Sequence, residues 1–155
     1  MKNIKQFLED SNIKDTLSKN HVFVVIKPGF ENIAGKLEEE FKKNGYKTVK
    51  MRSKRLLLDE AKEMYIMHKK EDFYEALCKY MSSGVTIAYI LKKKSDNIFK
   101  EFAELKDKLR EQYGESDMRN VLHSSDSYKN MTHESKLYFY NINQEDLTLK
   151  NKKTR

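Results

Sequence analysis

Two short apolar runs constrain the fold of this chain more than any other feature of its sequence. Residues 21–26 read His-Val-Phe-Val-Val-Ile, and residues 85–91 read Val-Thr-Ile-Ala-Tyr-Ile-Leu. A strand with one face in water alternates apolar and polar residues, whereas a continuous apolar run is typical of a strand covered on both faces. We therefore predict two strands that are buried on both faces.

The segments around these strands carry apolar residues at helical spacing. Ile33, Leu37 and Phe41 recur every four residues, which places one apolar stripe along a helix. The same reasoning predicts three more helices, at residues 57–68, 73–81 and 98–109. Residues 46–52 suit a further strand, and residues 119–123 form a short run that ends in a polar turn. Strands that alternate with helices predict an α/β sandwich, in which helices pack on a single sheet.

The chain is long enough for one domain. Its 155 residues match the usual size of a single domain, which we place at residues 20–142. Residues 1–19 form a weakly amphipathic extension, and residues 143–155 form a basic tail that we expect to be mobile. Eight Phe and nine Tyr argue against a disordered chain, because disordered segments are poor in aromatic residues.

Several classes of protein are excluded by what the sequence lacks. It contains one cysteine, Cys78, which excludes an internal disulfide and a multi-cysteine zinc site. No stretch approaches the ~20 apolar residues that a membrane-spanning helix needs, so we expect no membrane partner. The first residues include Glu9, Asp10 and Asp15 and no apolar core, unlike a secretion signal. We therefore expect a cytoplasmic protein.

The net charge indicates a class of ligand. Lys and Arg number 31 against 24 Asp and Glu, which gives a formal net charge of +7. A basic chain suits polyanionic partners such as phosphates, nucleotides or nucleic acid. A solvated surface rich in lysine explains the same charge equally well, so charge alone leaves these alternatives open.

Three short motifs carry more information than composition. In residues 120–127, Asn-Val-Leu-His-Ser-Ser-Asp-Ser, His123 is either a nucleophile or base, since imidazole changes protonation near neutral pH, or a surface histidine in a polar loop. In residues 26–29, Lys27 ends a strand just before a Pro-Gly turn, a position that phosphate sites favour. Residues 80–84, Tyr-Met-Ser-Ser-Gly, stop a helix before a buried strand.

In this order and spacing, the motifs resemble the nucleoside diphosphate kinase family over residues 21–139. The family's Ile-Lys-Pro-Asp-Gly is matched by residues 26–30, and its Tyr-Met-x-Ser-Gly by residues 80–84. Its signature Arg-Asn-x-x-His-Gly-Ser-Asp-Ser is matched by residues 119–127, Arg-Asn-Val-Leu-His-Ser-Ser-Asp-Ser. A glutamate before an aromatic stretch completes the pattern, here Glu134. Four ordered matches over most of the chain argue against chance agreement.

The resemblance implies a fold and an activity. The fold would be ferredoxin-like, with a four-stranded antiparallel sheet and helices on one side, which refines the α/β prediction. The activity would move the γ-phosphoryl group of a nucleoside triphosphate to a nucleoside diphosphate through a phosphohistidine. The implied partners are therefore nucleoside tri- and diphosphates, with Mg²⁺ held mainly by the nucleotide phosphates.

The resemblance also implies catalytic roles for three residues. His123 would be the nucleophile, which splits one transfer into two steps. Glu134 would orient and polarise the ring of His123. Ser125 would make a hydrogen bond nearby.

Five further residues match nucleotide-binding positions of the family. Lys27 and Arg110 match cations that bind phosphate, and Tyr65 matches a hydroxyl that supports the phosphate site. Phe73 matches the aromatic residue on which the base stacks, a contact that tolerates every base because every base has a π-face. Asn120 matches a contact to the sugar hydroxyl.

The sequence departs from the family pattern at three places. Gly29-Phe30 replaces Asp-Gly, Ser124 replaces the glycine after the nucleophile, and the segment between residues 91 and 110 is shorter. Aligned through that segment, Lys100 takes the position of an arginine that binds phosphate, while a phosphate-binding threonine has no counterpart. In hexameric members a Pro-containing loop of this segment lies at the threefold contacts, so we expect a dimer or a monomer here.

Two alternatives remain open at this stage. One is a degenerate member of the same fold that binds nucleotide or a protein partner with weak or no turnover; the shortened segment favours it, and the retained His123 argues against it. The other is a ferredoxin-like nucleic-acid binder, which the net charge favours. That class stacks bases on paired aromatic residues of the sheet, and because the sequence lacks this pattern we expect no nucleic-acid partner.

Overall fold

The computed structural model describes residues 17–140 of the chain. These residues form four strands, β1 (His21–Ile26), β2 (Lys47–Lys54), β3 (Thr86–Lys92) and β4 (Leu122–Ser124). They also form the α-helices α3 (Ala34–Lys43), α4 (Leu58–Met64), α5 (Tyr74–Met81), α6 (Ile98–Tyr113) and α7 (Tyr128–Ser135). Shorter elements are the 3₁₀-helices η1 (Glu31–Ile33) and η2 (Ile66–His68) and the π-helix η3 (Lys136–Tyr140). The predicted tail and the first 16 residues of the predicted extension lie outside the described residues.

The four strands join one sheet in the order β2-β3-β1-β4, and each neighbouring pair is antiparallel. The expected ferredoxin-like sheet of four antiparallel strands is thereby confirmed. The two apolar runs form the central strands β1 and β3, and the more polar segments form the edges. Position 25 of β1 lies opposite position 123 of β4, so the predicted nucleophile projects from an edge strand beside the centre of the sheet.

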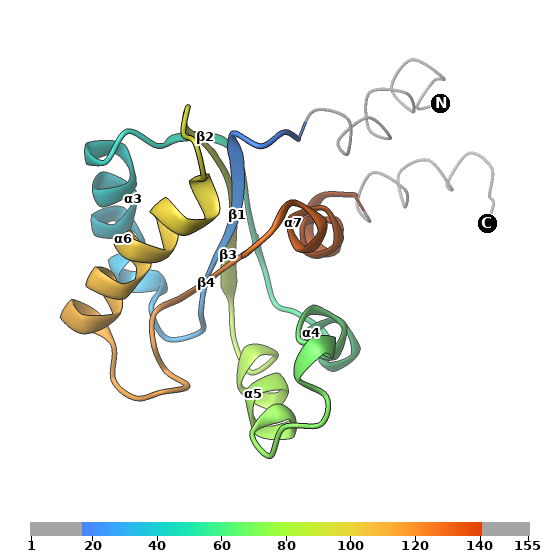
Figure 1. The fold of residues 1–155 in the computed structure, drawn as a ribbon. Helices are drawn as coiled ribbons and strands as arrows, with labels where there is room; N and C mark the ends of the chain where they lie inside the picture. The colour runs from blue at the N-terminus through green and yellow to red at the C-terminus, as the bar shows by residue number, and fades with distance from the viewer. Residues whose placement is uncertain (1–16, 141–155) are drawn as a thin grey trace, which may run out of the picture.

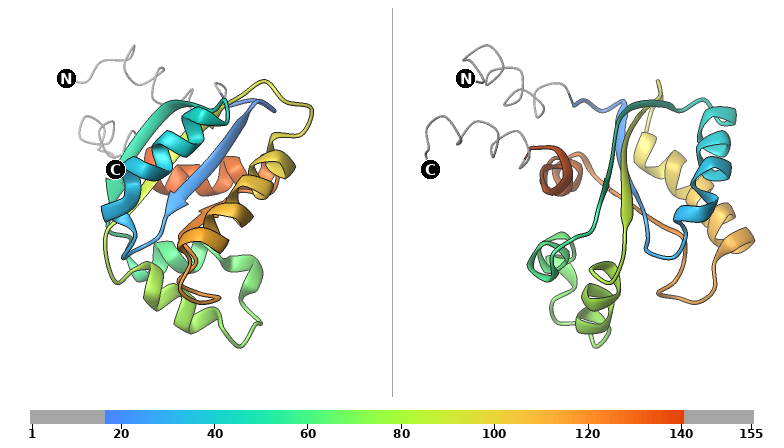
Figure 2. Two further views of the ribbon diagram at one scale, coloured as in Figure 1. Left: turned by 90° about the vertical axis from the view of Figure 1, so that its left-hand side faces the viewer. Right: turned by 180° about the vertical axis from the view of Figure 1, so that it is seen from behind.

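Helices cover both faces of the sheet (Figures 1 and 2). Val22, Val24 and Ile26 of β1 pack in one core with apolar residues of α3 and α6. Phe23 and Val25 point the other way and pack with residues of α4, α5 and α7. The expectation of helices on one side was therefore wrong. A strand that is apolar on both faces needs cover on both, which the continuous run in β1 already required.

Helix α6 brings one wall of the site into place. Its predicted apolar stripe is confirmed, since Ile98, Phe102, Leu105 and Leu109 are all buried against the sheet. The helix starts after Asn97, whose side chain accepts a hydrogen bond from a backbone N–H of the first turn. No helix within residues 17–140 is long and apolar enough to cross a membrane.

Candidate active site

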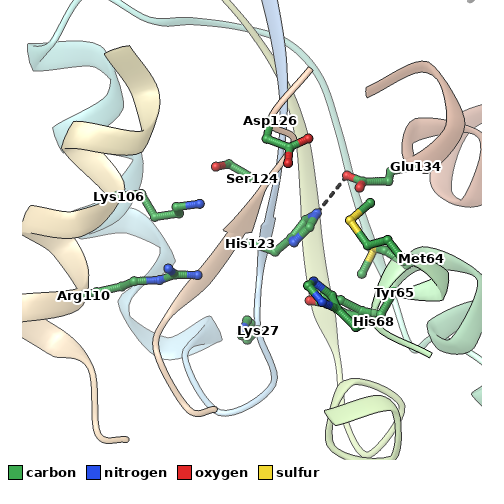
Figure 3. A pocket seen from close by; sticks show the side chains of 11 residues that line it. Lys27, Met64, Tyr65, His68, Lys106, Arg110, His123, Ser124, Asp126 and Glu134 are labelled. Atoms are coloured by element: carbon green, nitrogen blue, oxygen red, sulfur yellow. Dashed lines mark hydrogen bonds and ion pairs between the residues drawn. The ribbon is translucent and has the colours of Figure 1, made fainter. Parts of the chain in front are cut away.

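A cavity of about 230 Å³ lies where β1, β4, α6, α7 and the α4–η2 segment meet (Figure 3). Its walls bring together five residues that the sequence predicted, namely Lys27, Tyr65, Arg110, His123 and Glu134. The remaining lining residues are Met64, Met67, His68, Lys106, Ser124 and Asp126. Residues that lie more than 100 positions apart in the chain therefore form one site.

A carboxylate holds one ring nitrogen of His123. Its Nε2 lies 2.8 Å from Oε1 of Glu134, and Glu134 is only 2% exposed. An ionised carboxylate can only accept a hydrogen bond, so in the neutral ring Nε2 carries the proton and Nδ1 carries the free lone pair. Nδ1 makes no hydrogen bond to any residue between 17 and 140. The arrangement therefore leaves one ring nitrogen open to a ligand.

A strained turn sets the position of His123. Val121 has a φ of 80°, and the N–H of Leu122 donates to the carbonyl of Asn120 at 3.0 Å. This geometry is a γ-turn with a left-handed central residue, which is strained for a branched side chain. Val121 is fully buried, and β4 then pairs with β1 directly after the turn. Packing and pairing thus hold a backbone conformation that the local sequence does not favour.

The structure places Ser125 away from the cavity. Its Oγ accepts a hydrogen bond from the N–H of Phe23 at 3.0 Å, and its own N–H donates to the Phe23 carbonyl at 2.9 Å. The hydroxyl therefore extends the pairing of β4 with β1 and makes no hydrogen bond to His123. The neighbouring Ser124 lines the cavity instead.

Lys27 is almost completely buried, with 4% of its surface exposed. Its Nζ donates to Oδ1 of Asn120 at 2.7 Å and to the carbonyl of Met118 at 3.2 Å. Burial, helped by the charges of Arg110 and Lys106, lowers the pKa of Lys27 to about 7. Lys27 thus holds the loop before His123, and its charge in the cavity changes with pH near neutrality.

Helix α6 contributes two more cations, one of which sequence reasoning missed. Arg110 donates from Nη2 to the carbonyl of Leu122 at 2.8 Å and from Nε to that of Asn120 at 3.2 Å. Lys106 lies one helical turn earlier and lines the same cavity. Burial lowers the pKa of both side chains. The spacing of four residues between them is the signal that would have identified Lys106.

The structure does not bring Lys100 to the cavity. Lys100 is exposed in the first turn of α6, where its backbone N–H donates to Oδ1 of Asn97. The alignment through the shortened segment chose Lys100, but the lysine of α6 that lines the cavity with His123 is Lys106, six residues later. A single lysine matched to a single arginine could not reveal that offset, because α6 carries several lysines.

A second cavity of about 430 Å³ adjoins the first, since Lys27 lines both. It contains the predicted Phe73 and Asn120, together with Leu77, Asp117 and Met118. Phe73 lies at the start of α5 and is 45% exposed, so its ring is accessible to a ligand in this cavity. The amide of Asn120 is fixed from both ends, because its Nδ2 donates to the carbonyl of Asp117 at 2.8 Å.

Tyr65 and His68 form an aromatic link between the cavities. The Tyr65 ring meets the His123 ring edge-on with centroids 5.3 Å apart, and His68 lies 5.5 Å from Phe73. The Tyr65 hydroxyl is buried and has no hydrogen-bond partner within residues 17–140, and burial raises its pKa well above the ordinary value. Sequence reasoning placed His68 on a helical stripe, and nothing in its local pattern marked it as a site residue.

No group of three or more His, Cys, Asp or Glu side chains within residues 17–140 is arranged to hold a metal ion. The cavity beside His123 carries three cationic side chains, Lys27, Lys106 and Arg110, and two carboxylates, Asp126 and Glu134. A ligand for this cavity is therefore expected to bring negative charge with it.

Comparison with known proteins identifies the family. The family model described as nucleoside diphosphate kinase matches residues 20–143. The nucleoside diphosphate kinase of Methanococcus maripaludis is 31% identical over 128 residues, covering 76% of this chain and 96% of that protein. That of Chloroherpeton thalassium is 31% identical over 119 residues, covering 70% and 83%. The crystal structure of the Aquifex aeolicus nucleoside diphosphate kinase superposes with a TM-score of 0.70 at 23% identity, covering 76% and 93%. The chain belongs to the nucleoside diphosphate kinase family.

Proposed function

We propose that His123 carries the phosphoryl group while this phosphotransferase moves it from a nucleoside triphosphate to a nucleoside diphosphate. One observation carries the proposal. Glu134 holds Nε2 of His123, while Nδ1 is open in a cavity with three cationic side chains. This arrangement supports a histidine that receives the phosphoryl group, a carboxylate that orients its ring, and cationic side chains that bind the phosphate.

The transfer balances in two steps. The lone pair of Nδ1 attacks the γ-phosphorus, an N–P bond forms, and the P–O bond to the β-phosphate breaks with its electron pair left on the departing diphosphate. Glu134 accepts the hydrogen bond from Nε2–H and stabilises the positive charge that develops on the ring. A β-phosphate oxygen of a second nucleoside diphosphate then attacks the phosphorus, a P–O bond forms, and the N–P bond breaks with its electron pair returned to Nδ1, which regenerates the neutral histidine.

The cationic side chains would supply the charge stabilisation on which phosphoryl transfer depends. Lys27 and Arg110 are already fixed by hydrogen bonds to the loop before His123, so they would meet the phosphates with little rearrangement. Mg²⁺ would enter with the nucleotide and stay bound mainly to phosphate oxygens, where it offsets their charge. The lining fits this role, because its carboxylates are few and Glu134 already holds His123.

The second cavity suits the nucleoside. Phe73 offers a half-exposed ring on which a base can stack. Asn120 lines the same cavity and accepts a hydrogen bond from Lys27, so its amide suits a contact to the sugar hydroxyl. Stacking does not depend on the identity of the base. We therefore expect broad acceptance of nucleosides.

The test measures phosphate on the protein and on the product. Incubation with ATP and Mg²⁺ should add one acid-labile phosphate to the wild type in intact-mass analysis, and added GDP should remove it as GTP forms. His123→Ala should take up none. Phosphate retained by the alanine variant would assign the nucleophile elsewhere, and a wild type that never takes up phosphate would refute the transfer.

The assembly is proposed to be a dimer or a monomer rather than a hexamer. The connection from β3 to α6 is only five residues long, residues 93–97, and the sequence contains a single proline, Pro28. The edge strand β2 leaves Val49 and Met51 exposed, which suits pairing of two copies. Light scattering at micromolar concentration measures the mass directly, and a stable hexamer would contradict the proposal.

A further inference from the structure

The three cations of the cavity beside His123 differ in how the protein uses them. Lys27 and Arg110 donate hydrogen bonds to the loop that precedes His123. Lys106 makes no hydrogen bond and no ion pair with any residue between 17 and 140. Its stem is half-buried on α6, and its Nζ points from the helix into the cavity (Figure 3). Two of the cations therefore hold the backbone of the site by hydrogen bonds, and the third, Lys106, holds no part of it.

An ammonium group without a hydrogen bond or ion pair is electrostatically unfavourable in this position. Burial removes part of its hydration, and Arg110 one turn away repels it; both lower the pKa of Lys106. The carboxylates of Asp107, Asp126 and Glu134 attract it, but none of them forms an ion pair with it. A dianionic group that entered the cavity would offset both penalties at once.

We propose that Lys106 binds the phosphoryl group during its transfer, by direct contact with the oxygens of the phosphorus that His123 attacks. The proposal rests on the proposed function of His123 and adds a residue to it. In the transition state, charge is spread over these three oxygens while one P–O bond breaks and the N–P bond forms. Lys106 and Arg110 lie on the α6 wall of the cavity, and their charged ends point into the space that His123 also lines.

This contact would replace the one that the shortened segment removes. Lys100, the residue that sequence alignment offered for the role, is exposed and outside the cavity. Lys106 reaches the cavity from the middle of α6, six residues later, and needs no loop to position it. A lysine supplies a point charge rather than a planar fork, so Lys106 can follow the phosphoryl group as it moves between nucleotide and histidine.

The experiment compares Lys106→Met, Lys106→Arg and a control variant, Lys108→Met. Lys108 lies on the same helix, is exposed and does not line this cavity. Rapid mixing with ATP and Mg²⁺ gives the rate at which His123 is phosphorylated. Loss of one charge-assisted contact should slow Lys106→Met by about 10- to 100-fold. Lys106→Arg should recover most of the rate, and Lys108→Met should match the wild type.

A binding measurement separates a phosphate contact from a structural role. Lys106→Met should weaken binding of a non-transferable ATP analogue more than binding of ADP, because only the analogue places a third phosphate beside Lys106. Its melting temperature should be equal to or above that of the wild type, because an uncompensated charge has been removed. Equal losses for both nucleotides, or a lower melting temperature, would make Lys106 structural and overturn the proposal.

The two proposals fail differently. If the wild type forms no phosphohistidine, the proposed function itself is refuted. If the wild type forms it and Lys106→Met forms it at the same rate, the role of Lys106 is refuted while that of His123 stands.

Discussion

The two sides of the active site are built in different ways. On the side formed by β1, β4 and α7, the functional side chains are held by hydrogen bonds: Glu134 holds His123, and Lys27 holds Asn120. The side formed by α4, η2 and α5 has more exposed side chains and a buried hydroxyl without a hydrogen bond. Phe73 and Met67 are 45% and 52% exposed, and the Tyr65 hydroxyl has no partner within residues 17–140.

The difference follows from what each side must do. A reaction that forms and breaks bonds at one phosphorus needs groups fixed before the substrate arrives, since preorganised charges need no rearrangement at the transition state. A nucleoside that is recognised by its flat face needs only an accessible ring. Substitutions at His123 and Glu134 should therefore alter kcat, whereas substitution of the exposed Phe73 ring should alter KM.

The largest effect is expected from Glu134→Gln. The amide still accepts the hydrogen bond from Nε2–H but no longer offsets the positive charge on the phosphorylated ring. Loss of that charge should lower kcat about 10- to 100-fold with little change in KM. The surface pair of His133 and Glu63, 3.0 Å apart and largely exposed, provides the matched control. If Glu63→Gln lowers kcat as much as Glu134→Gln does, the loss of kcat cannot be assigned to the buried carboxylate beside His123.

On the open side, Phe73→Ala should raise KM for nucleotides by about tenfold and leave kcat nearly unchanged. The magnitude is at the lower end of base-stacking energies, as expected for a ring that is half-exposed. Phe73→Tyr should behave as wild type, because it keeps the ring. Steady-state assays with purine and pyrimidine diphosphates measure both constants. A loss confined to one base would contradict recognition by stacking.

The charge of Lys27 makes nucleotide binding depend on pH. Its pKa of about 7 in the free protein will rise when phosphate enters, so the complex binds more protons than its components. Affinity for ADP should then fall about fivefold from pH 7 to pH 8. Calorimetry in buffers of different ionisation enthalpy should detect proton uptake at pH 8. Lys27→Arg should show much less uptake, since arginine keeps its charge, and unchanged uptake would exclude Lys27 as the source.

The smallest effect on stability is expected from Tyr65→Phe. Because the hydroxyl has no hydrogen-bond partner within residues 17–140, its removal should leave the melting temperature unchanged or slightly raised. If the hydroxyl supports bound phosphate, kcat/KM should nevertheless fall severalfold. A clear loss of stability would show that the hydroxyl supports the fold rather than the ligand.

The same contrast explains what the sequence could predict. The central strands and the meeting of His123 with Glu134 followed from a continuous apolar run and an ordered motif, because both depend on nearby residues. The face that α6 turns to the cavity depends on how the helix packs, so the alignment chose Lys100 and missed Lys106. The hydroxyl of Ser125 pairs with β1 rather than with His123, which only the register of β4 determines.

The turn at Val121 also limits how this sequence can change. Glycine would adopt a φ of 80° without strain, but it would leave empty the buried space that the isopropyl group fills. A larger side chain would keep the strain and crowd the core. Val121 lines neither cavity of the site, yet few substitutions there would be neutral. A survey of tolerated mutations would therefore group it with the residues that perform the chemistry, although its constraint comes from the backbone.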